Sequence, residues 1–91
     1  MPLPEDVPND LLYMHKAYDW LYSKHGLNLV AAADKGDDTC KELLRKLNTH
    51  INTIEFWQLN DRFDRAHYEV EQLKKWFDPI MLNLARWIQE H

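Results

Sequence analysis

The most regular feature of this sequence is a ladder of apolar residues in its last third. The ladder advances in alternating steps of three and four residues, and it consists of Phe56, Leu59, Phe63, Ala66, Val70, Leu73, Phe77, Ile80, Leu84 and Trp87. In a helix such steps return side chains to one narrow face, which another helix must cover. The ladder therefore predicts a long C-terminal helix that packs through a coiled-coil-like seam.

Two further helical patterns precede the ladder. A first helix is predicted over 8–25, with Pro8 in its first turn, Gly26 as its C-terminal stop and one apolar face made of Leu11, Met14, Tyr18, Leu21 and His25. Asn28 then suits the N-cap of a short alanine-containing helix, and 34–38 has the composition of a turn.

A second long helix is predicted over 39–58. Thr39 and Glu42 form the T-x-x-E pattern of a capping box at its start. Its stripe ends at Ile54, two residues before Phe56, so the stripe and the ladder cannot share one unbroken helical face. We predict a turn at Asn60-Asp61 and a new helix from 61; one continuous helix with a register stagger is the alternative.

Asp78-Pro79 reads as a cap followed by a first-turn proline, which predicts a kink or a restart with a nearly collinear helix over 79–90. The predicted fold class is therefore all-α, a small bundle of about three to five helices with a long heptad-patterned C-terminal helix kinked at Pro79. Residues 1–7 are expected to form an extended acidic arm, and 8–91 a single helical domain.

Composition favours contact with other protein. The 91 residues include four Trp, four Tyr and three Phe, more aromatic surface than so short a chain easily hides. The net charge of −4, without clustered Lys and Arg, makes a nucleic-acid partner unlikely on electrostatic grounds. Cys40 is the only cysteine, and no apolar run is long enough to span a bilayer, so we predict a cytoplasmic protein without membrane contact.

One group of residues resembles part of a metal site. Asp64, His67 and Glu71 stand at i, i+3 and i+7, half of the carboxylate and histidine spacing that helix bundles use for two metal ions. The second half is absent, so the prediction is a salt-bridged face with Arg65 and Lys74 nearby. We accordingly predict no metal, no cofactor and no catalytic residue.

Two other side chains occupy notable positions. His50 lies on the stripe of the second long helix, where it either fixes register or partner choice or serves as a hydrogen-bonded core residue. Cys40 stands in the first turn of that helix, where the helix dipole favours a thiolate but neighbouring acids oppose it. Without a base or an oxyanion arrangement, Cys40 is interpreted as a small apolar residue at the start of the stripe.

A weaker pattern suggests DNA binding. Within 29–47, Ala32 and Gly36 have helix-turn-helix spacing, and basic residues follow on the next helix. However, the inward positions of that helix would be Glu42 and Arg45, which are charged.

The leading functional hypothesis is a non-enzymatic protein-protein interaction protein: an adaptor, subunit or inhibitor that binds a partner protein of unknown identity and forms a homodimer. The small size, the acidity and the high aromatic content without catalytic motifs suit an accessory protein of a phage or other mobile element. The alternatives are a helix-turn-helix-like DNA-binding regulator using 29–47 and a metal-dependent helical-bundle enzyme. The predicted interface consists of Phe63, Val70, Leu73, Trp76, Phe77, Ile80, Met81, Leu84, Trp87 and Ile88.

Overall fold

The computed structural model describes residues 6–91, and all regular structure within them is helical. The helices are α1 (Asp6–Leu21), α2 (Lys24–Asp34), α3 (Asp38–Leu59), α4 (Phe63–Leu82) and α5 (Leu84–Glu90). The prediction of a small all-α bundle is confirmed. The predicted N-terminal arm falls outside the described residues as far as residue 5, and α1 begins at Asp6.

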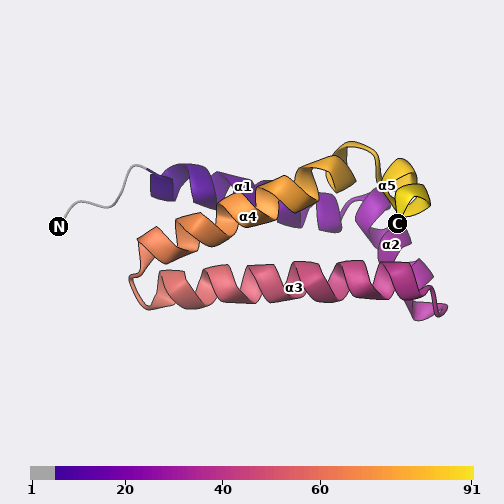
Figure 1. Cartoon of the computed structure of the whole chain (residues 1–91), viewed down its shortest axis with the longest axis horizontal. Coiled ribbons are helices and arrows are strands. Elements are labelled where there is room, and N and C mark those ends of the chain that lie inside the picture. Colours follow the sequence, from indigo (N-terminus) through magenta and orange to yellow (C-terminus); the bar gives the residue numbers. More distant parts are fainter. Residues whose placement is uncertain (1–5) are drawn as a thin grey trace.

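Helix α4 is the centre of the bundle (Figure 1). α3 runs antiparallel to α4 along one side, and α1 runs parallel to α4 along another, while the short helices α2 and α5 lie together at one end. The described chain is elongated, with extents of 47 × 21 × 21 Å. No helix within residues 6–91 combines the length and the apolar character that a membrane crossing requires.

The core forms where α1 and α3 cover one face of α4. That face contributes Ala66, Val70, Leu73, Phe77 and Ile80, which are at most 2% exposed. The covering residues include Tyr13, Met14 and Ala17 from α1, and Leu43, Leu47, Ile51 and Ile54 from α3. These five positions of the ladder therefore pack against helices of the same chain.

The predicted turn between the second and third long helices is confirmed, and the alternative of one continuous helix is wrong. Asp61 adopts a left-handed backbone conformation with φ of 57°, and the Asn60 side-chain amide donates to the Phe56 carbonyl at 2.7 Å. Phe56 and Leu59 consequently belong to α3, where they are 55% and 85% exposed. The apolar ladder thus does not continue from α4 into the residues before the turn.

The predicted helix over 8–25 is wrong at its end, because the chain turns at Tyr22 and Ser23. Gly26 does not stop a helix: it is buried inside α2, where it approaches the backbone of Leu21. Asn28 likewise lies within α2 rather than at an N-cap, a position that Ser23 occupies. The chain needs glycine at 26 for close approach between α1 and α2 and not for a left-handed cap.

The capping box predicted for α3 is also corrected. The N-cap is Asp37, whose Oδ1 accepts a hydrogen bond from the Cys40 amide at 2.9 Å, and Thr39 stands inside the helix. This hydrogen bond to the carboxylate lowers the pKa of Asp37 below its ordinary value. Asp37 thereby satisfies an amide that the first turn of α3 leaves without a helical partner.

The predicted restart at Pro79 is wrong, because α4 continues through Pro79 to Leu82. The break comes at Asn83, whose Oδ1 accepts from the Arg86 amide at 3.1 Å and caps α5. The Asn83 side chain thus satisfies an amide in the first turn of α5 that has no helical acceptor. A kink at Pro79 itself stays a prediction.

Candidate functional site

The ten residues of the predicted interface divide into two groups. Val70, Leu73, Phe77 and Ile80 have no exposed surface within the single chain. The other six are partly exposed, and they are Phe63, Trp76, Met81, Leu84, Trp87 and Ile88. If this fold is kept, another protein can contact only the six partly exposed residues of this set. Five of these six lie at the end of the bundle where α4 ends and α5 follows.

Helix α5 does not fully bury its apolar residues. None of the seven residues of α5 is buried, although Leu84, Trp87 and Ile88 pack against the core cluster. The Trp87 ring meets Trp76 edge to face at 6.4 Å and stacks on His91 at 4.1 Å. The end of the bundle is consequently closed by a short helix that leaves apolar surface on both of its sides.

A groove of about 390 Å³ lies between α2 and α5. Its apolar lining comes from Leu29, Ala32, Cys40, Met81, Leu82, Leu84, Ala85 and Ile88, and its polar lining from His25, Asn28 and Asn83. Leu82 is 87% exposed. Three residues of the predicted interface, Met81, Leu84 and Ile88, thus line a concave surface whose opposite wall, α2, the sequence analysis did not identify.

Cys40 is buried where this groove meets α3. The thiol is free, and its residue is 2% exposed. Burial, followed by the hydrogen bond with Asp37, raises the pKa of Cys40 above its ordinary value. The thiol therefore has neither the access nor the thiolate character of a nucleophile, in agreement with its interpretation as a small apolar residue.

On the other side of α5, Trp76 and Trp87 line a second hollow of about 520 Å³ with residues of α3. The Lys46 ammonium lies 4.8 Å from the centre of the Trp76 ring, a cation–π contact. Arg45, beside it, is 2.6 Å from the Glu42 carboxylate. Two basic residues of the 29–47 segment considered for DNA binding, Arg45 and Lys46, therefore make contacts within the chain.

The helix-turn-helix hypothesis meets a further difficulty. α2 and α3 are joined by a short turn with Gly36 at φ of 101°, as that hypothesis requires. Glu42 and Arg45, which stand at the inward positions of the pattern, are both exposed. DNA binding by this segment stays a prediction that a salt-dependent gel shift would test.

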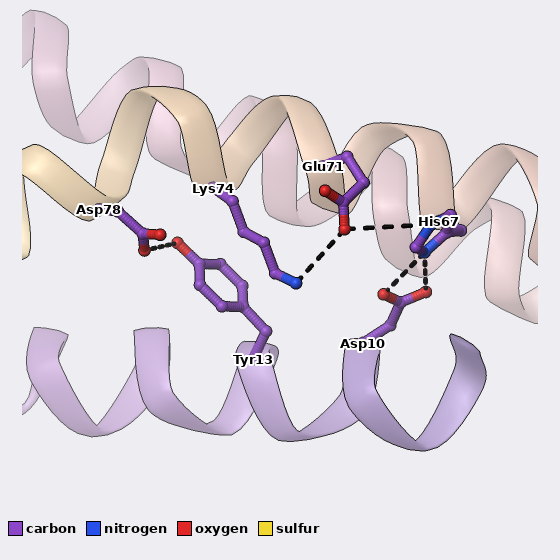
Figure 2. A network of polar contacts seen from close by, with 6 residues as sticks. All are labelled: Asp10, Tyr13, His67, Glu71, Lys74 and Asp78. Atoms are coloured by element: carbon purple, nitrogen blue, oxygen red, sulfur yellow. Dashed lines mark hydrogen bonds and ion pairs between the residues drawn. The ribbon is translucent and has the colours of Figure 1, made fainter. Parts of the chain in front are cut away.

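The three residues of the predicted half metal site do not stay together. The Asp64 side chain is 71% exposed and contacts Arg62, which lowers the pKa of Asp64. His67 and Glu71 instead face α1 (Figure 2). There His67 Nδ1 lies 3.0 and 3.1 Å from the two carboxylate oxygens of Asp10, and His67 Nε2 lies 3.9 Å from Glu71 Oε1.

The polar contacts continue along the seam between α1 and α4 (Figure 2). Lys74 Nζ is 3.3 Å from Glu71 Oε1 and 5.3 Å from the centre of the Tyr13 ring. The Tyr13 hydroxyl donates to Asp78 Oδ1 at 2.8 Å. Burial, with help from this hydrogen bond, raises the pKa of Tyr13 above its ordinary value. These contacts fix the position of α1 along α4.

His50 lies in the seam between α3 and α4 with an 18% exposed side chain. Its ring is 5.8 Å from the Trp76 ring, and its Nδ1 is 3.7 Å from Glu69 Oε2. Burial is the largest influence on this group and lowers the pKa of His50, against the opposing effect of Glu69. The geometry favours the hypothesis of a core histidine that is neutral near neutral pH.

His50 predicts a specific dependence of stability on pH. Because its pKa is lower in the folded chain than the ordinary 6.5, the unfolded chain binds more protons in the interval between the two values. The His50 contribution is thus complete above pH 6.5 and declines as pH falls toward the folded pKa. We expect the free energy of unfolding of His50→Gln to fall less than that of the wild type over this interval, measured by urea titration at a series of pH values. Parallel curves would contradict the assignment.

Sequence reasoning missed Asp10, the one charged or polar side chain among the buried residues of the described chain. A signal was available, because Asp10 precedes Tyr13 and Met14 by three and four residues and so shares the buried face of α1. A carboxylate on such a face requires a partner. Its partner is far along the chain and leaves no local pattern.

No protein-family model, no curated protein and no solved structure matches this chain.

Proposed function

We propose that this protein is a non-enzymatic interaction protein, an adaptor, subunit or inhibitor, that binds a partner protein and a second copy of itself through the end of the bundle formed by α2, the last turn of α4 and α5. The observation that carries the proposal is the apolar groove between α2 and α5, together with the exposed Leu82 that contributes to its lining. We place the protein in the cytoplasm in this proposal, because a free cysteine such as Cys40 suits a reducing compartment.

The groove has the features of a protein contact. Leu29, Met81 and Ile88 supply apolar walls that one inserted side chain of a partner helix would cover. His25, Asn28 and Asn83 supply hydrogen-bonding groups. An apolar centre with polar groups around it is the usual composition of such surfaces.

In the proposed homodimer, each chain contributes the same end of its bundle, the one formed by α2, the last turn of α4 and α5. In a two-fold dimer each chain presents the same patch, so an apolar residue such as Leu82 can enter the groove of the other copy. The fully buried ladder positions are not required for this arrangement, because α1 and α3 already cover them.

Two matched substitutions test the proposal. Leu82 and Leu59 are 87% and 85% exposed. They are the last residues of α4 and α3, and because these helices run antiparallel (Figure 1), the two residues lie at opposite ends of the pair. Since neither is buried, Leu82→Asp and Leu59→Asp should both fold with a free energy of unfolding within about 0.5 kcal/mol of the wild type. Only Leu82→Asp introduces a charge at the proposed contact.

The measurement is the native mass by light scattering behind size exclusion over about a hundredfold range of concentration. We expect a wild-type dimer that persists in Leu59→Asp and shifts toward monomer in Leu82→Asp. A wild type that is monomeric throughout removes the self-association part of the proposal. The partner part is then tested by cross-linking in cells, and a cross-linked protein that Leu82→Asp and Leu59→Asp retain equally would contradict it.

A further inference from the structure

Three potential metal ligands from two helices converge near the start of the bundle. Asp10 comes from α1, and His67 and Glu71 lie one turn apart on α4 (Figure 2). One ligand atom from each residue can be chosen so that all three lie within 4.8 Å of one another. Ligands of a tetrahedral zinc ion lie about 2.0–2.2 Å from the metal, and hence about 3–4 Å apart. The group needs only small side-chain movements to reach that spacing.

The burial of Asp10 is an independent reason to expect a cation here. Its side chain is 4% exposed, and both of its oxygens face His67. A carboxylate removed from water is costly unless a positive charge or several hydrogen bonds compensate it. A proton on His67 can provide that charge, and so can a divalent metal ion bound between the same groups.

The ligand chemistry selects the class of metal. One imidazole nitrogen and two carboxylates form a mixed nitrogen and oxygen ligand set. This set suits Zn²⁺, Co²⁺ or Ni²⁺ better than Mg²⁺ or Ca²⁺, which prefer ligands that are all oxygen. Two carboxylates and a neutral imidazole carry a charge of −2, which a divalent ion neutralises. Lys74 Nζ lies 3.3 Å from Glu71 Oε1, the same oxygen that lies 3.9 Å from His67 Nε2, so a metal ion at this oxygen takes the place of the Lys74 ammonium.

We propose that Asp10, His67 and Glu71 bind one zinc-class divalent ion that joins α1 to α4. The site is structural, and it lies away from the α2–α5 groove, so it does not depend on the proposed function. It also corrects the ligand set that the sequence suggests, because Asp10 from α1 takes the place of Asp64. Metal affinity should fall as pH falls through the histidine range, because the imidazole must be neutral to bind.

The test is calorimetric titration of untagged, chelator-treated protein with Zn²⁺, together with thermal unfolding at one equivalent of the ion. We expect one ion per chain and a raised melting temperature. His67→Gln should abolish this binding. Glu71→Gln, which leaves the contact between Asp10 and His67 intact, should weaken it by about tenfold or more. Far-UV circular dichroism confirms that each variant is folded.

Asp64→Asn and His15→Gln are the matched controls, since both residues are exposed and neither belongs to the group. They should bind Zn²⁺ with wild-type affinity. The proposal is overturned if the wild type binds no Zn²⁺ under these conditions. It is equally overturned if folded His67→Gln and Glu71→Gln bind the ion as the wild type does, because the binding then resides on other surface groups.

Discussion

Replacing Leu73 with aspartate is expected to unfold the protein. Leu73 has no exposed surface and lies at the middle of the α4 face that α1 and α3 cover. The substitution removes packing worth about 2–5 kcal/mol. It also places a carboxylate at a position without exposed surface, at a further cost of several kcal/mol. Together these losses are comparable to the total stability of a small domain, about 5–15 kcal/mol. Far-UV circular dichroism and thermal unfolding would show the loss of helix.

Two further variants make the Leu73 result interpretable. Leu73→Ala should remain folded with a free energy of unfolding lower by about 2–5 kcal/mol. Lys75→Asp, on the exposed side of the same helix, should change it by less than about 0.5 kcal/mol. If Leu73→Asp kept its helix content and melting temperature but lost native mass, the ladder would pair two chains rather than helices of one chain. Such a result would contradict the packing described for α4.

The part of the fold that the sequence predicted well is the part governed by local periodicity. Ala66, Val70, Leu73, Phe77 and Ile80 recur at helical spacing, and that spacing alone places them on one buried face. The same reasoning failed at Phe56 and Leu59, because apolar residues of two separate helices can continue one phase by coincidence. The turn with Asp61 in the left-handed conformation separates the two helices. The only sign of it in the sequence is that the apolar stripe of the second long helix ends at Ile54, two residues before Phe56.

The polar site could not be assembled from the sequence, because its parts are brought together by tertiary structure. Asp10 and His67 are 57 positions apart and meet only when α1 packs along α4. A search along one helix selects Asp64, which is near His67 in sequence but points to Arg62. The α2–α5 groove has the same origin: the wall with Met81 and Ile88 follows from the apolar C-terminal pattern, whereas the α2 wall depends on how the chain turns after Leu21.

That turn depends on Gly26, where backbone contact and helix propensity predict opposite effects. Propensity alone makes Gly26→Ala stabilising by about 1 kcal/mol, because glycine is a poor residue inside a helix. A Cβ atom at this position would lie 2.0 Å from the Leu21 carbonyl oxygen and 2.4 Å from its carbonyl carbon. Both are backbone atoms, so no side-chain rotation relieves the overlap.

We therefore expect Gly26→Ala to destabilise the protein by about 1–3 kcal/mol or more, since overpacking moves the backbone of α1 away from α2. Urea unfolding followed by circular dichroism measures the change. Ala31→Gly, at an exposed position of the same helix, calibrates propensity and should cost about 1 kcal/mol. A stabilised Gly26→Ala would mean that propensity governs both positions and that α2 stands further from Leu21. If helix propensity alone governed both positions, removing glycine at 26 would stabilise the protein and introducing it at 31 would destabilise it. Destabilisation by both substitutions therefore requires the close approach between Gly26 and the Leu21 backbone.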